Sequence, residues 1–279
     1  MTMLWGSSTD FVRSYLRWAG SKRQLLPILS RYWSDGFSRY IEPFAGSSCL
    51  FFHIEPRDAI LGDLNGELIS AMRAIKLDVG RVIECLRRLP RSRSNYYRIR
   101  RIDPRTLGLC ESAARFLYLN SLCFNGLYRT NIGGQFNVPY CPPGHNTVPE
   151  DALVQASVLL RGATLLRGDF EQTISTSGAG DFVYLDPPYA LSGRRVFSEY
   201  GPTTFQSNDL DRLRKSLVML EKRGAKFVVS YADCKEARVA LRDWKVRRVR
   251  TRRNIAGFTG DRKGSYELLA TNLEIQEIV

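Results

Sequence analysis

The four residues Asp186-Pro187-Pro188-Tyr189 combine groups that can hold a flat, nitrogen-bearing molecule. They follow the apolar run 181–185, which predicts a buried strand, so the carboxylate lies just past the carboxyl end of that strand, where open α/β sheets bind ligands. The two prolines have no N–H and leave only carbonyl acceptors at the turn. An acid, an outward-facing carbonyl and an aromatic ring together suit a planar group that carries an NH2.

The exocyclic amine of a nucleobase is such a group. Its nitrogen is a poor nucleophile because its lone pair is delocalised into the ring. If the Asp186 carboxylate and the Pro187 carbonyl hold its two hydrogens, the nitrogen can become pyramidal and expose the lone pair. Tyr189 can stack on the base, because aromatic rings favour offset contact. The alternative is an ordinary strand-to-loop turn, in which Asp and Pro are common.

A second set of residues has the features of a cofactor site. Residues 42–47 (EPFAGS) read as a turn from a strand into a helix, with a glycine where the backbone must approach a ligand closely. Asp63 ends the next predicted strand and is placed to bind ribose hydroxyls. Asp169 and Phe170 follow another strand and can contact a purine. Each acid is alternatively a helix N-cap or turn residue, and 18–22 (WAGSK) is alternatively a helix start with a surface lysine.

Charge is the unusual bulk property of the chain. Its 279 residues include 41 Lys+Arg against 28 Asp+Glu, and the formal net charge of +13 attracts polyanions. A basic protein without a nucleic-acid role is the alternative. Six scattered cysteines without a C-x-x-C pair, and only two histidines, predict no metal site and no disulfide framework. No apolar stretch approaches the ~20 residues that span a bilayer, so we expect an intracellular, cytoplasmic setting and no membrane or protein partner.

The elements that must position these residues alternate between strand and helix. The patterns predict strands at 39–42, 58–63, 164–167, 181–185, 226–231, 244–250 and 266–273, and helices starting at 48 and 65 and covering 79–89, 95–102, 112–122, 150–160, 207–222 and 234–241. The middle of the chain interrupts this α/β pattern with helices and a Gly133-Gly134 hairpin signal. We therefore predict two parts of one α/β domain, 1–77 and 149–279, separated by an insert, 78–148.

Two basic runs have two interpretations each. Eight arginines between Arg81 and Arg101 either contact phosphates or form a solvated helix face, and the net positive charge favours phosphate contact. The run 245–253 (KVRRVRTRR) either contacts phosphates as well or is an exposed strand edge, where charge prevents aggregation.

Taken together, these segments resemble the Dam family of DNA adenine-N6 methyltransferases. The order of cofactor turn, recognition insert and catalytic turn is that of the family, and the resemblance covers residues 15–273. The matching segments are 17–22 (RWAGSK), 42–46 (EPFAG), 62–65 (GDLN), 116–120 (FLYLN), 124–129 (FNGLYR), 135–139 (QFNVP), 168–170 (GDF), 186–189 (DPPY) and 266–272 (YELLATN).

The resemblance implies a fold and a set of site residues. The fold is a Rossmann-like methyltransferase sheet with an inserted, mainly helical DNA-recognition domain that carries a β-hairpin. S-adenosylmethionine is implied as methyl donor, without a metal, and double-stranded DNA as partner. The catalytic residues implied are Asp186, Pro187, Pro188 and Tyr189. The cofactor-binding residues implied are Trp18, Lys22, Glu42, Phe44, Gly46, Asp63, Asp169, Phe170 and Asp186. The DNA-binding residues implied are Phe124, Asn125, Arg129 and Pro139.

The function implied is site-specific transfer of a methyl group to N6 of an adenine that is flipped out of the duplex. Arg129 would pair with a guanine through O6 and N7, which favours GATC or another GAT-containing site. Phe124 takes the place of an aromatic residue that wedges into the base stack. In place of the Gly and basic residue with which the family usually reads later bases, this chain has 141–144 (CPPG).

Several alternatives stay open at this point. They are a methyltransferase acting on RNA adenine or on a protein amide, and a DNA-binding relative that has lost catalysis. A dehydrogenase is excluded by the absent G-x-G-x-x-G fingerprint. The sequence also leaves open whether the enzyme serves a restriction-modification system.

Overall fold

The fold is an α/β sheet with helices on both faces. The computed structural model describes residues 15–141, 148–189, 205, 207–251 and 265–274. Its strands are β1 (Tyr40–Glu42), β2 (Ala59–Asp63), β3 (Ala163–Arg167), β4 (Phe182–Leu185), β5 (Lys226–Ala232), β6 (Lys245–Thr251) and β7 (Ser265–Thr271). Its α-helices are α1 (Leu26–Leu29), α2 (Cys49–Ile54), α3 (Gly66–Arg87), α4 (Arg93–Arg100), α5 (Leu109–Leu122), α6 (Glu150–Leu160), α7 (Phe170–Ser175), α8 (Ser207–Lys222) and α9 (Lys235–Ala240). Short 3-10 helices cover η1 (Arg23–Leu25), η2 (Ser30–Tyr32), η3 (Pro104–Thr106) and η4 (Phe124–Gly126).

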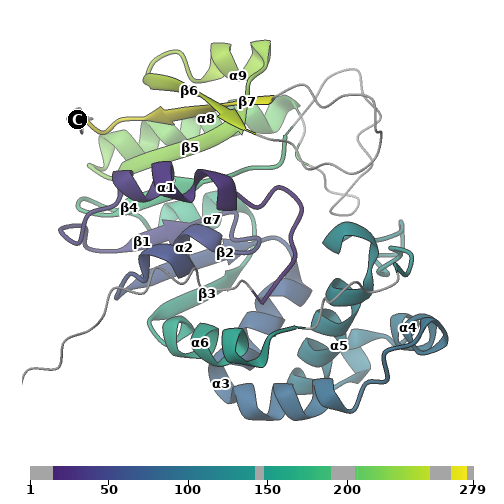
Figure 1. Cartoon of the computed structure of the whole chain (residues 1–279). Helices are drawn as coiled ribbons and strands as arrows, with labels where there is room; N and C mark the ends of the chain where they lie inside the picture. Colours follow the sequence, from purple (N-terminus) through teal and green to yellow (C-terminus); the bar gives the residue numbers. More distant parts are fainter. Residues whose placement is uncertain (1–14, 142–147, 190–204, 206, 252–264, 275–279) are drawn as a thin grey trace, which may run out of the picture.

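Seven strands pair in the order β3-β2-β1-β4-β5-β7-β6 (Figure 1). β7 runs antiparallel to both β5 and β6, and the other neighbours are parallel. The order changes direction between β1 and β4, so the carboxyl ends of the central strands form the ligand-binding edge expected of an open α/β sheet. This sheet confirms the predicted α/β class and is consistent with the methyltransferase fold.

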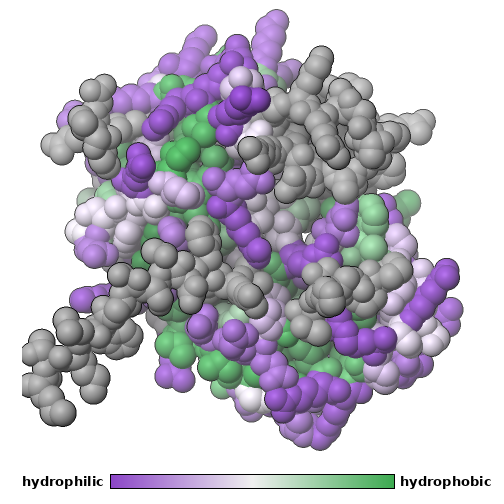
Figure 2. All heavy atoms as spheres, in the orientation of Figure 1, coloured by the Kyte–Doolittle hydropathy of each residue, from purple (hydrophilic) through white to green (hydrophobic). Residues whose placement is uncertain are grey.

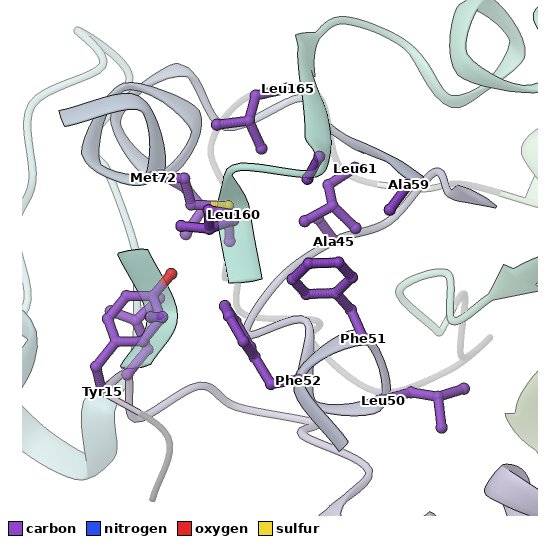
Figure 3. Close-up of a cluster of buried hydrophobic side chains, with 14 of the residues drawn as sticks. Tyr15, Ala45, Leu50, Phe51, Phe52, Ala59, Leu61, Met72, Leu160 and Leu165 are labelled. Carbon is purple, nitrogen blue, oxygen red and sulfur yellow. The ribbon is translucent and has the colours of Figure 1, made fainter. Parts of the chain in front are cut away.

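The alternation of side chains along each strand builds two hydrophobic cores. In β4, Phe182 and Tyr184 join one cluster, while Val183 and Leu185 join the other, because successive side chains point to opposite faces. The first cluster packs under α1, α2, α3 and α6, and Figure 3 shows part of it. The second packs under α7, α8 and α9. A sheet covered on both faces needs apolar residues at every position, which explains the uninterrupted apolar run of β4.

The middle of the chain, around α4 and α5 in Figure 1, has a third hydrophobic cluster. It joins α4, α5 and the segment after α5 through Tyr96, Ile99, Tyr118, Leu119, Leu122, Cys123, Phe136 and Val138. α5 also contributes Ala113, Phe116 and Leu117 to the first cluster, so this helix connects the middle segment to the sheet. The boundaries 1–77, 78–148 and 149–279 stay a prediction, although the backbone of α3 leaves the helical range at Asp78.

The capping residues explain where helices begin. The side chain of Asn65 accepts hydrogen bonds from the backbone N–H groups of Glu67 and Leu68, which have no partner within the helix, so α3 starts where predicted. α6 and α8 have the predicted bounds.

Three features differ from the sequence-based expectation or were missed by it, and a fourth decides between two interpretations. α3 continues through Asp78 to Arg87 instead of ending before a second helix. The hairpin turn is longer than the two-residue signal at Gly133-Gly134 predicted: Asn131 N–H bonds to the Gln135 carbonyl, leaving three residues between them. α7 was not predicted. Finally, β6 is an edge strand, as one interpretation of the basic run 245–253 expected, and the two arginines at 252 and 253 lie outside the described residues.

The charged residues gather away from the cores. On the face shown in Figure 2, hydrophilic side chains cluster over β6 and α9 at one end and over α3 and α4 at the other. Among the helices of the described ranges, none combines the length and the apolarity that crossing a membrane requires.

Candidate active site

Three carboxylates lie at the carboxyl ends of three neighbouring parallel strands. Asp63 ends β2, Glu42 ends β1, and Asp186 follows β4, and these strands are adjacent in the order β2-β1-β4. Asp63 is held by two backbone donors, Gly46 N–H at 2.9 Å and Asn65 N–H at 2.8 Å. Burial raises the pKa of Asp63, and these two hydrogen bonds oppose the increase. The sheet therefore brings the two turns predicted from the sequence to one edge.

Lys22 forms an ion pair with Asp186. Its Nζ lies 2.6 Å from Asp186 Oδ1 and donates to the Gly20 carbonyl at 3.0 Å. Lys22 is buried, so the surface-lysine interpretation of residues 18–22 is wrong. Burial alone would lower the pKa of Lys22, but the negative charge of Asp186, with Tyr189 and Glu267, raises it above its usual value. The ammonium therefore stays charged and fixes one carboxylate oxygen of Asp186.

Tyr189 completes the turn that begins at Asp186. Nζ of Lys22 lies 5.1 Å from the centre of the Tyr189 ring, and this ring packs against Tyr231 with centroids 5.0 Å apart. Pro187 is buried, and Pro188 is partly exposed. Lys22 thus contacts both the first and the last residue of this turn, and the binding of a base there stays a prediction.

Glu42 is a buried acid between the other two carboxylates. Its Oε2 accepts a hydrogen bond from the Tyr40 hydroxyl at 3.0 Å. Burial raises the pKa of Glu42 well above its usual value; the Tyr40 bond opposes this, and the charges of Asp186 and Asp63 add to it. Because both neighbours act on Glu42, the three acids belong to one electrostatic site.

The raised pKa of Glu42 predicts a stability change with pH. Between the unfolded pKa of about 4.3 and the higher folded pKa, the folded state binds the proton more tightly, so stability falls as pH rises. Glu42→Gln removes this slope, which is worth about 1.4 kcal/mol per pH unit for a single group. We expect the variant to exceed wild type in free energy of unfolding at pH 7, by a margin that grows from pH 5 upward, in urea titrations.

Glu84→Gln is the matched control for this measurement. Glu84 is exposed, and a hydrogen bond from Arg81 lowers its pKa, so its removal gives no gain at neutral pH. Parallel stability-versus-pH curves for wild type and Glu42→Gln would contradict the assignment of Glu42 as a buried, proton-holding acid.

The turn at Gly46 approaches Trp18 closely. Gly46 has φ +48°, and a Cβ atom there would lie 2.9 Å from Nε1 of Trp18. Trp18 in turn stacks on Tyr128, with ring centroids 6.0 Å apart and planes 24° apart. A glycine is required on both counts, since an L-residue is strained at this φ and its Cβ would displace the indole.

Gly46→Ala is expected to weaken binding of S-adenosylmethionine, the cofactor that the resemblance implies, about tenfold, because a strained residue and a displaced Trp18 side chain together cost on the order of 1–3 kcal/mol. Isothermal titration with the cofactor measures the effect. Gly134→Ala is the matched control: Gly134 also has positive φ, +75°, but a Cβ there meets nothing within 4 Å. Equal cofactor affinity for both variants would show that the Gly46 turn lies outside the cofactor site.

Asp169 and Phe170 start α7 beside this edge. Asp169 is the N-cap of α7, accepting from Glu171 N–H at 3.0 Å, and Arg212 donates to the same oxygen at 2.7 Å. The N-cap interpretation is therefore confirmed, and a contact with adenine stays a prediction. Phe170 stacks on Phe44, with centroids 5.1 Å apart. The two rings predicted to line one pocket are thus in contact.

The residues predicted to contact DNA gather at the turn after α5. Phe124, whose exposed fraction is 41%, donates its N–H to the Pro139 carbonyl at 3.1 Å. Asn125 has φ +53°, a conformation that Asn tolerates better than most residues. Nε of Arg129 donates to Asn137 Oδ1 at 2.8 Å. The turn and the hairpin therefore hold all four predicted residues on one connected segment.

Two polar networks that the sequence did not reveal attach this segment to Arg17 and to the start of α3. Asn120 is buried and exchanges two hydrogen bonds with the backbone of Arg17, its Oδ1 accepting at 3.0 Å and its Nδ2 donating at 2.7 Å. Glu67 accepts from buried Arg115 at 2.9 Å and from the Tyr128 hydroxyl at 2.9 Å. The signal for them in the sequence was an Arg and an Asn within the mostly apolar stretch 113–120 of α5.

The arginines of the first basic run divide into two groups. Arg81, Arg87 and Arg88 pair with the carboxylates of Glu84, Glu111 and Glu150. Arg100 donates to the carbonyls of residues 137 and 138. Arg93 and Arg101 are exposed and form no ion pair with any residue that the structure describes. Part of the run therefore stabilises the helices, and part is available to a polyanion.

Within the described ranges, the His, Cys, Asp and Glu side chains form no group of three or more that could hold a metal ion.

Known proteins match the chain over nearly its whole length. A family model described as D12 class N6 adenine-specific DNA methyltransferase matches residues 18–255. Type II methyltransferase M.MjaIII of Methanocaldococcus jannaschii is 34% identical, covering 94% of this chain and 99% of its own length. Type II methyltransferase M1.LlaDCHI of Lactococcus lactis subsp. cremoris is 32% identical, with coverage of 94% and 95%. The DNA adenine methylase of Escherichia coli is 30% identical, with coverage of 92% and 94%. The chain therefore belongs to the D12 class of N6 adenine-specific DNA methyltransferases, an enzyme family whose activity implies S-adenosylmethionine as methyl donor and DNA as substrate.

Proposed function

We propose that this enzyme methylates N6 of an adenine that it flips out of duplex DNA into the turn Asp186–Tyr189, at GATC or a related GAT-containing site. The observation that carries the proposal is the convergence of Asp63, Glu42 and Asp186 at adjacent strand ends, with Lys22 paired to Asp186. Asp63 and Glu42 at two strand ends suit the hydroxyls and amines of a nucleoside cofactor. Asp186 begins the turn whose composition suits a base.

The residues around Gly46 fit S-adenosylmethionine. The close approach of the backbone to Trp18 at Gly46 leaves no room for a side chain, and Asp63 fixes the N–H of this glycine. Trp18, Lys22, Glu42, Phe44, Gly46, Asp63, Asp169, Phe170 and Asp186 would hold the cofactor. When bound, S-adenosylmethionine supplies a methyl group on a positively charged sulfur.

The turn orients the amine that accepts the methyl group. The Asp186 carboxylate and the Pro187 carbonyl accept hydrogen bonds from the two N6 hydrogens, and Tyr189 stacks on the base. As N6 acquires positive charge, both acceptors bind its hydrogens more strongly than in the ground state, which lowers the barrier. Base flipping costs a few kcal/mol of unstacking, which stacking on Tyr189 and these hydrogen bonds offset.

Residues 78–148 would act as the target-recognition insert. Arg129 reads the guanine that begins the site, Phe124 occupies the gap that the adenine leaves, and Asn125 and Pro139 contact neighbouring bases. Arg93 and Arg101 contact phosphates, which position the protein without specifying sequence.

Transfer of tritium from labelled S-adenosylmethionine to short duplexes tests this proposal. We expect rapid labelling of a GATC duplex and slow labelling of duplexes with one base changed. No labelling is expected when the target adenine is replaced by purine, which lacks the N6 amine. A target 2-aminopurine is expected to gain fluorescence on binding, since its ring leaves the stack. Labelling of RNA in preference to DNA, or cofactor binding without transfer to any duplex, would identify one of the alternative functions instead.

A further inference from the structure

We propose that Ser230 and Tyr184 are positioning residues that orient the Asp186 carboxylate for the transfer reaction. The inference rests on the role proposed above for Asp186. Ser230 Oγ donates to Asp186 Oδ1 at 3.0 Å, and the Tyr184 hydroxyl lies 3.0 Å from Ser230 Oγ. Neither residue belongs to the motifs that the sequence analysis identified.

The register of two parallel strands places the three residues together. Tyr184 in β4 is the partner of Val228 in β5, and both side chains lie in the same hydrophobic cluster. Two residues later along each strand the side chains return to that face. Asp186 and Ser230 therefore follow Tyr184 and Val228 on the same side of the sheet, at the edge where the strands end.

The number of available protons sets the direction of the hydrogen bonds. Ser230 has one hydroxyl hydrogen, and the geometry assigns it to Asp186. The Ser230 oxygen must then accept from Tyr184, so the chain runs from Tyr184 to Ser230 to Asp186. Both hydroxyl residues are fully buried, so neither can exchange its partner for water without cost.

Both contacts of Asp186 use the same oxygen. Lys22 Nζ and Ser230 Oγ both bind Oδ1, at 2.6 and 3.0 Å. Within the part of the chain that the structure describes, no group donates to Oδ2, and the side chain retains an exposed fraction of 19%. Two donors on one oxygen fix the rotation of the carboxylate and leave Oδ2 to accept a hydrogen from N6.

Three variants test the proposal: Ser230→Ala, Tyr184→Phe and the double variant. Controls are Thr271→Val and Tyr118→Phe, which remove buried hydroxyls bonded to backbone carbonyls, those of Phe227 and Pro90. We expect Ser230→Ala to lower the single-turnover rate about 10-fold to 100-fold, because a misplaced reacting group costs that much, with unchanged dissociation constants for cofactor and DNA. Tyr184→Phe is expected to act in the same direction, more weakly.

The double variant distinguishes positioning from a general effect on the core. Because Tyr184 acts only through Ser230, the double variant is expected to be no slower than Ser230→Ala alone. The proposal would be overturned if the rate losses of the two single variants multiplied in the double variant. It would also be overturned if Ser230→Ala and Tyr184→Phe were no slower than the two control variants. Tyr184→Phe keeps the ring in place, so it still gives a result if Ser230→Ala does not fold.

A structural measurement separates this inference from the proposed function. If the wild-type enzyme methylated no adenine at all, the proposed function would fail, and crystal structures of wild type and Ser230→Ala would still decide the positioning role. We expect the Asp186 carboxylate to be rotated in the variant. An identical orientation of the Asp186 carboxylate in the two crystals would refute the positioning role of Ser230.

Discussion

Asp186→Ala is expected to lower the single-turnover rate of adenine methylation by about 10³-fold or more, since it removes an oriented acceptor at the reacting nitrogen. The substitution leaves only the Pro187 carbonyl to hold one of the two N6 hydrogens. Cofactor binding is expected to weaken less than the rate falls: Asp186 is one of the residues proposed to hold the cofactor, but Asp63, Glu42 and the Gly46 turn are untouched. Rapid-quench transfer of labelled methyl to a GATC duplex measures the rate, and isothermal titration measures the cofactor affinity.

This variant also disturbs the fold, because Asp186 compensates the buried charge of Lys22. Removing one partner of a buried ion pair costs about 3–5 kcal/mol, and Glu267, whose Oε2 lies 3.9 Å from Lys22 Nζ, is the acid that remains beside this charge. Asp186→Ala combined with Lys22→Met removes both charges, and we expect this pair to recover most of the lost stability but none of the lost activity. Asp186→Asn, which keeps an acceptor oxygen, is expected to be intermediate in rate.

The comparison of these variants decides between two roles. If activity returned with stability in the double variant, Asp186 would be a structural partner of Lys22 and not a catalytic acceptor. A normal rate for Asp186→Ala would have the same meaning.

The sequence predicted the local elements of this site well, for physical reasons that are visible in single residues. β4 could be predicted because a strand buried on both faces is apolar throughout, and α3 because Asn65 is a strong N-cap. The strand-end positions of Glu42, Asp63 and Asp186 followed from those elements. Their convergence then followed from the rule that ligands bind at the carboxyl edge of a parallel sheet.

The partners of these acids could not be predicted in the same way, because they depend on the strand register and on contacts between distant segments. Lys22 precedes the first strand by 18 residues, and a surface lysine was one interpretation of it, yet it is buried and paired with Asp186. Ser230 reads as one polar residue in a buried strand, and only the pairing of β4 with β5 places it beside Asp186. Asn120 contacts Arg17 across 103 positions of the chain.

The second large effect is expected at Arg129. Its Nε is fixed by Asn137, and its two terminal nitrogens have no partner among the residues that the structure describes, so they remain free for the two acceptors of a guanine. Arg129→Ala is expected to lower kcat/KM at GATC by ~10-fold to ~100-fold, because a bidentate pair contributes about 1–3 kcal/mol of discrimination. The same variant is expected to tolerate other bases at the first position, which competition between duplexes measures.

Arg93→Ala is the matched control, because an arginine that contacts phosphates acts on every sequence alike. We expect it to weaken binding uniformly and to reduce the dependence of affinity on salt, with the preference for GATC unchanged. Arg129→Ala should do the reverse: the preference falls and the salt dependence changes little, since the arginine reads a base edge. If Arg129→Ala reduced activity equally on all duplexes, Arg129 would be a phosphate contact. The first base of the site would then be read by another residue of the turn that joins α5 to the hairpin.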